Sequence, residues 1–186
     1  KKVREALGGS CGNVLLSLAH LKRNVAPLLK FGSDDVGETL FKEFAEAGAD
    51  TRYISRRADI DSPILAQRLT TTPMQHYFSF ICPETDRALP RAQLIDEQIL
   101  DSAKSLLGDC TVFYTDRISQ VILEAMKTAS NAGALVYFEP SAVDDAELFV
   151  KALRLAQVVK FSSDRLKEFS FASDIEENTI LMITHG

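Results

Sequence analysis

A glycine-rich turn, Gly8-Gly9-Ser10-Cys11-Gly12-Asn13, runs directly into an apolar helical stretch near the start of the chain. Small residues ahead of a helix let a ligand approach bare backbone N–H groups, and a helix start favours electron-rich oxygen ligands. The Asn13 amide can donate and accept hydrogen bonds, which suits hydroxyl groups. The competing interpretation is a tight turn that only leads into a core helix.

Further polar residues follow the segments that we interpret as buried strands. These strand-end residues are Asp34, Asp116, Glu139, Lys160, Ser162, Thr184 and Gly186. In a parallel α/β sheet, ligands collect beyond the carboxyl ends of the strands. Each residue also has a simpler interpretation. An Asp in such a place can cap a helix, Lys160 can be a solvated charge, and Glu139 can orient its turn.

Several common chemistries are not supported by the motifs. The chain has no Gly-x-Ser-x-Gly and no P-loop, and no serine has a sequence cue for a partner histidine. His20, His76 and His185 share no metal-ligand spacing, which argues against a structural zinc site.

Composition narrows the class of protein further. The 186 residues are 46% hydrophobic and 25% charged, with a net charge of −5 and scattered Lys and Arg, so nucleic acid is not the expected partner. Cys11, Cys82 and Cys110 are too few and too far apart for a disulfide framework, which suits a cytoplasmic protein. We find no signal peptide and no run long enough to span a membrane.

The apolar pattern predicts alternating helices and strands. Early in the chain we expect a helix after the glycine turn, a strand over 26–31, a helix that is capped by the polar turn 33–37 and stops at Gly48, and a strand over 51–54. Later we expect helices over 94–107, 119–132 and 144–153, strands over 111–114, 134–138, 157–161 and 179–184, and a short helix capped by Ser162 or Ser163. Continuous apolar strands between amphipathic helices predict an α/β fold with a mostly parallel sheet sandwiched by helices.

One segment differs from the rest of the chain in its pattern of polar and apolar residues. Residues 64–70 and 76–81 mix polar and apolar positions, as half-exposed strands do, and residues 71–73 supply a turn. We therefore divide the chain into an N-terminal part of the core over 1–61, a small β lid with its connection over 62–91, and a second part of the core over 92–186. The first residues leave no room for a core strand before the glycine turn, and the last strand stops at a turn. We expect a fragment of a longer protein.

Taken in order, these pieces resemble one family. Its first signature region is similar to Gly-Gly-Ser-x-Gly-Asn-Val (8–14), Phe-Gly-Ser-Asp-Asp-Val-Gly (31–37) and Ala-Gly-Ala-Asp-Thr (47–51). Its later strand ends resemble residues 136–141, 158–162 and 183–186. The chain thus resembles the ribokinase-like (PfkB-type) carbohydrate kinases from Gly8 to Gly186.

The resemblance implies ATP-dependent phosphorylation of a hydroxymethyl group on a sugar or sugar-like alcohol. Mg²⁺ would accompany ATP, and a monovalent cation is a further candidate cofactor. The residues carried over are Gly8, Gly9, Asn13, Asp34 and Asp116 for the sugar, and Lys160, Ser162, Thr184 and Gly186 for the nucleotide, so residues 92–186 form the nucleotide-side half. The lid would exclude water and supply a homodimer contact.

The catalytic residue implied by the family lies outside the sequence. Its general-base Asp should follow Gly186, so we assign no catalytic residue, leave the metal ligands open, and expect this chain to be inert. The family also has an acidic residue where this chain has Arg165, although Asp164 is a candidate replacement. Glu139 stands where the family has Asp.

Two other interpretations stay open. A non-catalytic ribokinase-like module that binds a sugar or a protein is the alternative, and Arg165 favours it. A doubly wound α/β domain of unrelated function is the third. The sequence does not name the sugar: Arg87 and Arg91 would suit an anionic one, but both also fit ordinary surface arginines.

Overall fold

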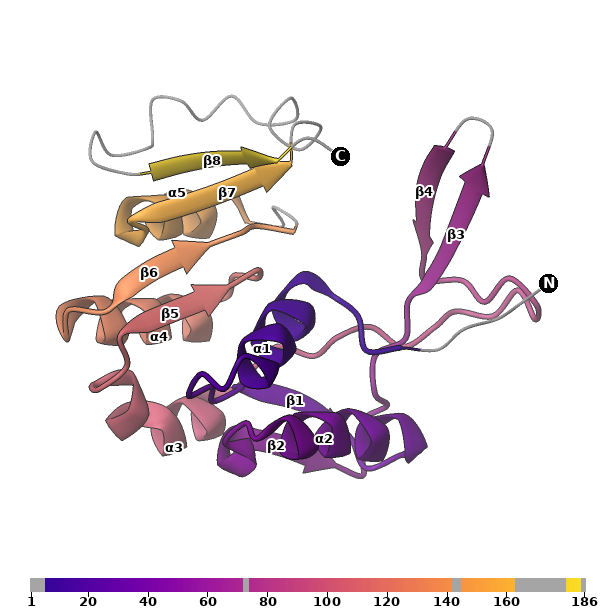
Figure 1. The fold of residues 1–186 in the computed structure, drawn as a ribbon, viewed down its shortest axis with the longest axis horizontal. Coiled ribbons are helices and arrows are strands. Elements are labelled where there is room, and N and C mark those ends of the chain that lie inside the picture. The colour runs from indigo at the N-terminus through magenta and orange to yellow at the C-terminus, as the bar shows by residue number, and fades with distance from the viewer. Residues whose placement is uncertain (1–5, 72–73, 142–144, 163–179, 185–186) are drawn as a thin grey trace. The chain divides into compact units, whose positions relative to one another are not determined.

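The computed structural model describes residues 6–71, 74–141, 145–162 and 180–184. The chain divides into two compact units, residues 1–94 and 95–186 (Figure 1). Both units combine helices with strands, as the alternating sequence pattern predicts. No helix among the described residues is long and apolar enough to cross a membrane.

The first unit contains a pair of parallel strands covered by helices. Strand β1 (Leu29–Gly32) pairs with β2 (Ile54–Arg57), with Leu29 opposite Ile54. Helix α1 (Ser10–His20) contacts helix α2 (Asp35–Ala47), which crosses over between the two strands. Phe31, Phe44 and Ile54 form a buried cluster at their centre, which supplies the burial that holds these short elements together.

Helix α2 ends at Gly48 as predicted, and it begins within the polar turn 33–37 expected to cap it. The Asp34 side chain caps its start by accepting the Gly37 N–H at 2.7 Å, and Gly48 ends it in a left-handed conformation with φ of 88°. A carboxylate at the N-cap satisfies a backbone donor that has no partner within the helix, and glycine adopts positive φ at little cost. Both predicted signals are confirmed.

Two predicted strands in this unit have different limits. The strand expected over 26–31 is reduced to Leu29–Gly32, and Pro27, which has no N–H for a ladder, lies outside it. The strand expected over 51–54 is wrong for its first three residues, which form a 3₁₀ helix, η1 (Thr51–Tyr53). Asp50 caps that turn by accepting the Arg52 N–H, so the strand starts only at Ile54.

The predicted hairpin is confirmed, although its strands span 66–71 and 74–79 instead of the expected 64–70 and 76–81, so Thr71 belongs to a strand and not to the turn. Strands β3 (Ala66–Thr71) and β4 (Met74–Ser79) pair antiparallel with Ala66 opposite Ser79, and the turn residues 72–73 lie outside the described residues. The hairpin keeps large apolar side chains exposed, among them Leu69 and Phe78 at 61% and 64%.

Among the described residues of the second unit, four parallel strands follow one another in chain order. They are β5 (Val112–Thr115), β6 (Leu135–Phe138), β7 (Val158–Ser162) and β8 (Ile180–Thr184). The helices between and before them are α3 (Glu97–Leu107), α4 (Gln120–Asn131) and α5 (Ala146–Leu155). The parallel sheet with intervening helices is therefore confirmed, while the short helix expected after β7 lies outside the described residues.

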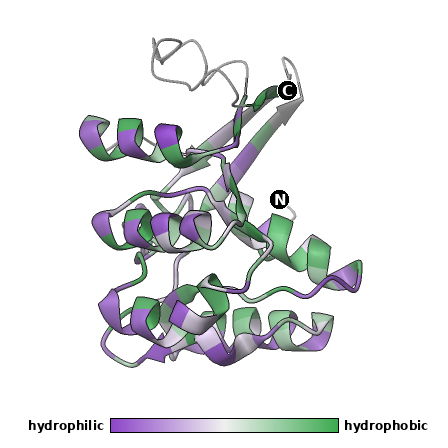
Figure 2. Cartoon of the chain, turned by 90° about the vertical axis from the view of Figure 1, so that its left-hand side faces the viewer, coloured by the Kyte–Doolittle hydropathy of each residue, from purple (hydrophilic) through white to green (hydrophobic). Residues whose placement is uncertain are grey.

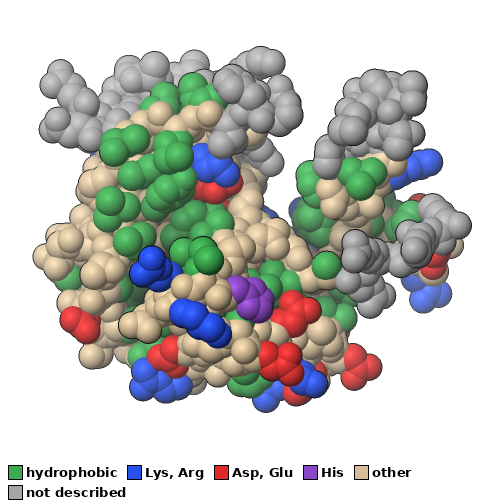
Figure 3. Space-filling view, viewed as in Figure 1, with side chains coloured by type: hydrophobic (Ala, Val, Ile, Leu, Met, Phe, Trp, Pro, Cys, Tyr) green, Lys and Arg blue, Asp and Glu red, His purple; other side chains and the backbone are tan. Residues whose placement is uncertain are grey.

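The core of this unit lies between the sheet and its helices. Val136 and Phe138 of β6 are buried against Met126 of α4 and Phe149 of α5, and polar and apolar residues alternate along the helices (Figure 2). Residues one step along the strands, such as Leu135, point to the opposite face. Apolar side chains gather over that face, with Val112 and Ile180 more than half exposed (Figure 3).

Candidate functional site

The glycine turn leaves the start of α1 without a side-chain cap. Gly9 occupies the N-cap position with φ of 81° and ψ of 150°, and the first turn of the helix carries no acidic residue. Gly8, Gly9 and Asn13 are all exposed, and the Asn13 N–H donates to the Gly9 carbonyl at 3.0 Å. The structure therefore brings these three predicted residues together at a helix start that no N-cap side chain covers.

Asp34 lies at the carboxyl end of β1 in the same unit. One carboxylate oxygen accepts the Gly37 N–H, and the other accepts the Ser62 N–H at 2.8 Å. These bonds hold the pKa of Asp34 below its ordinary value of 3.8, with the Ser62 amide as the largest cause. Asp34 is thus an oriented anion and a helix cap at once. The capping interpretation is borne out, and its predicted contact with a substrate stays a prediction.

Ser62, which the sequence did not single out, is the polar residue that completes this arrangement. Its side chain is buried, and its hydroxyl accepts the Gly32 N–H at 3.0 Å. The one available signal was its position, directly before Pro63 at the start of the predicted lid segment.

In the second unit, the predicted residues gather at the carboxyl edge of the sheet. Asp116 follows β5, and its carbonyl accepts both the N–H and the hydroxyl of Ser141, each at 2.9 Å. Ser162 ends β7 directly opposite Thr184 of β8. Parallel pairing explains why residues far apart in sequence share this edge. Gly186, Arg165 and Asp164 lie outside the described residues.

A charge pair occupies the middle of this edge. The Lys160 ammonium lies 2.6 Å from one Glu139 oxygen, and the Tyr114 hydroxyl donates to the other at 3.0 Å. The two charged side chains are only 25% and 18% exposed. Tyr137 packs against Tyr114, and burial together with the Glu139 charge raises the pKa of the Tyr137 hydroxyl. Sequence reasoning named Glu139 and Lys160 separately and missed that they neutralise each other.

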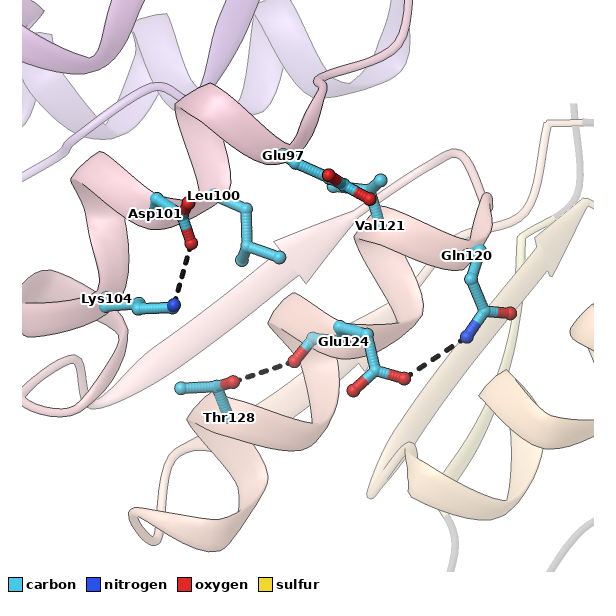
Figure 4. A pocket seen from close by; sticks show the side chains of 8 residues that line it. All are labelled: Glu97, Leu100, Asp101, Lys104, Gln120, Val121, Glu124 and Thr128. Atoms are coloured by element: carbon cyan, nitrogen blue, oxygen red, sulfur yellow. Dashed lines mark hydrogen bonds and ion pairs between the residues drawn. The ribbon is translucent and has the colours of Figure 1, made fainter.

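Two other features of this unit do not add to the site. Within the described ranges, no three His, Cys, Asp or Glu side chains are grouped to hold a metal ion. A groove between α3 and α4 contains none of the predicted residues (Figure 4). Two of its charges pair within α3, Asp101 with Lys104 at 2.7 Å, and Glu124 pairs within α4 with Lys127 at 2.7 Å, as is typical of a solvated helix surface.

Asp34 should stabilise the first unit in a pH-dependent way. Because its folded pKa is depressed, its contribution is present above the unfolded value of about 3.9 and is lost as pH falls through the folded pKa. We expect Asp34→Ala to lower the free energy of unfolding at neutral pH by about 1–2 kcal/mol, as for other lost N-caps. The difference in the free energy of unfolding between Asp34→Ala and wild type should disappear at acid pH.

Urea unfolding at neutral and acid pH measures this effect. Asp35→Ala is the matched control, because it removes the neighbouring carboxylate in the first turn without removing the cap. A difference between Asp34→Ala and wild type that stayed constant across this pH range would contradict the assigned role.

The pairing of Lys160 with Glu139 makes a second prediction. Lys160→Met leaves a partly buried carboxylate without its cation, and we expect a loss of about 1–2 kcal/mol, between the values for exposed and fully buried pairs. Glu139→Gln should cost less in the Lys160→Met background than in wild type, because the two changes remove one interaction. Urea unfolding of wild type, the two single variants and the double variant gives the coupling free energy between Lys160 and Glu139. Purely additive losses of stability would rule out this coupling.

Comparison with known proteins shows which proteins have sequences similar to this chain. The chain is 22% identical over 98% of its length to a probable fructokinase-4 of Arabidopsis thaliana, and 26% identical over 89% to an aminoimidazole riboside kinase of Salmonella typhimurium. It covers 58% and 54% of those two proteins, so it spans little more than half of the curated relatives it matches.

Comparison with solved structures also finds similarity to fructokinases. The chain superposes over its full length on a fructokinase from Xylella fastidiosa with a TM-score of 0.74 and 25% identity, covering 65% of that protein. A second structure of fructokinase from that organism, with bound ATP, matches 96% of the chain with a TM-score of 0.72 and 27% identity, and the chain covers 62% of it. The fold is therefore ribokinase-like, as the sequence resemblance implied. A family model described as pfkB family carbohydrate kinase matches residues 1–185, and the chain belongs to that family.

Proposed function

We propose that this chain carries the sugar-binding turn and part of the ATP site of a kinase that phosphorylates a sugar hydroxymethyl group. The observation that carries the proposal is the uncapped start of α1, with Gly8, Gly9 and Asn13 exposed together in a member of this family. Backbone N–H groups there can donate to sugar oxygens, and Asn13 can both donate and accept. Asp34 can accept from a sugar hydroxyl, because its carboxylate has lone pairs beyond the two already used.

The second unit would bind the nucleotide. Ser162 and Thr184, paired at the carboxyl edge of β7 and β8, are the residues we assign to the phosphate side, together with Gly186. Asp116 is assigned to the substrate from the same edge. Lys160 can contribute net positive charge to a phosphate only if its ammonium group leaves Glu139. We therefore assign it a weaker role at the phosphates than its residue type suggests.

Mg²⁺ would come with ATP. The described residues offer no cage for it, and Mg²⁺ in kinase sites is held largely by phosphates, waters and one or two carboxylates. We therefore assign no protein ligand to this ion.

Fructose is the first substrate to test, because relatives and structural neighbours are named fructokinases. The riboside kinase among the relatives makes a ribose compound the second. The hairpin β3–β4 would act as the lid, and its exposed Leu69 and Phe78 suit a contact with a second copy.

Ligand-induced stabilisation tests the proposal directly. A ligand that binds only the folded state raises the melting temperature. We expect fructose or ribose to raise it, with a further rise from ATP and Mg²⁺. Asn13→Ala should weaken sugar affinity about tenfold, the equivalent of one or two lost hydrogen bonds.

Ser17→Ala is the matched control, an exposed position one turn further along α1. Stabilisation by sugar with no response to nucleotide would favour the non-catalytic binding module instead. No response to sugar or ATP, or equal loss in both variants, would refute the assignment of the turn.

A further inference from the structure

Ser62 is unusual among the polar residues of the first unit because it is almost completely buried. Its relative exposure is 1%, and it lies in the segment that leads from β2 to the hairpin. Burying a hydroxyl is costly unless it is hydrogen-bonded, so its partners show what it holds in place.

Those partners come from two other segments of the unit. The Ser62 hydroxyl accepts the Gly32 N–H at 3.0 Å and lies 3.4 Å from the Gly32 carbonyl oxygen, to which it donates. The Ser62 N–H donates to Asp34 at 2.8 Å, and the second oxygen of Asp34 accepts the Gly37 N–H. One serine therefore joins the end of β1, the cap of α2 and the start of the hairpin segment.

The backbones of these segments approach so closely that no side chain fits at the two glycines between them. A Cβ atom on Gly37 would lie 2.0 Å from the Gly32 carbonyl oxygen and 2.7 Å from the Ser62 hydroxyl. A Cβ on Gly32 would lie 2.6 Å from the Ile60 carbonyl oxygen. Both glycines are required by close backbone approach, which fixes the Ser62 hydroxyl relative to Asp34.

The same segment also anchors both legs of the hairpin. Two residues after Ser62, the Ile64 N–H donates to the carbonyl of Pro90 at 3.0 Å, on the chain returning from the hairpin. The Leu89 N–H bonds to the Phe80 carbonyl at 2.7 Å on that same return. The root of the hairpin is therefore bonded to the same short segment whose Ser62 N–H bonds to Asp34.

We propose that Ser62 is a positioning residue that couples the root of the hairpin to Asp34 and so fixes the carboxylate for a sugar hydroxyl. The coupling of Ser62 to Asp34 stands on the geometry of the first unit, and its effect on sugar rests on the proposed function. Ser62 itself touches no reacting atom. It acts through Asp34, so its loss should alter sugar affinity more than nucleotide affinity.

The test compares Ser62→Ala with Ile54→Val in the full 186-residue chain. Ile54 belongs to the buried cluster of the same unit but makes none of these hydrogen bonds, so it reports plain destabilisation. Two quantities are measured. One is the titration of the Asp34 carboxyl carbon by NMR, and the other is the affinity for fructose and for ATP by calorimetry. If Ser62→Ala does not fold, Ser62→Cys, which keeps a weak donor of similar size, replaces it.

We expect the pKa of Asp34 to rise part of the way toward its ordinary value in Ser62→Ala, because this variant keeps the backbone N–H but loses the hydroxyl, which also lowers that pKa, and to stay as depressed as in wild type in Ile54→Val. Fructose affinity should fall about tenfold in Ser62→Ala alone, the size of one or two lost hydrogen bonds, with ATP affinity unchanged. An unchanged Asp34 titration in the Ser62 variant would overturn the proposal. If the Asp34 titration shifts in Ser62→Ala but the wild-type chain binds no sugar, the coupling of Ser62 to Asp34 is upheld and the proposed function is refuted.

Discussion

Parallel strand pairing is the constraint on which the candidate site depends. Because β5 to β8 run in the same direction, each strand delivers its next residues to one edge of the sheet, where Asp116, Glu139 and the Ser162–Thr184 pair meet. The β1–β2 pair does the same for Asp34 in the first unit. In the second unit, burial of Val136, Phe138 and Phe149 between sheet and helices holds the strands together away from this edge, where ligands bind in such folds.

At each edge, the charged groups are held by local bonds before any ligand arrives. Asp34 is fixed by two backbone N–H groups, and Glu139 is fixed by Lys160 and Tyr114. Groups held in this way lose little conformational freedom when a ligand binds, which favours affinity. The same bonds also limit what each group can do. The Asp34 oxygens have lone pairs left to accept from a hydroxyl, whereas the Lys160 charge is already neutralised.

The sequence predicted the fold well wherever a local signal had one physical meaning. Asp34 and Gly48 mark the ends of α2 because a cap and a left-handed stop are local chemistry, and the continuous apolar runs of β5 to β8 indicate parallel strands. Prediction was wrong at residues 51–53, where the Asp50 cap forms a 3₁₀ turn instead of a strand. It also missed Ser62 and the Glu139–Lys160 pair, since both depend on contacts between residues 21 or more positions apart.

Hydrogen exchange of the chain with and without fructose tests the central claim most directly, namely that the first unit binds a sugar at the glycine turn and Asp34. Binding slows exchange of the amides that a ligand covers or orders. The account predicts slower exchange in residues 8–13, 34–37 and 62–64 on addition of fructose or ribose, and no change on α3 and α4. Protection confined to other segments, or none with either sugar, would contradict it.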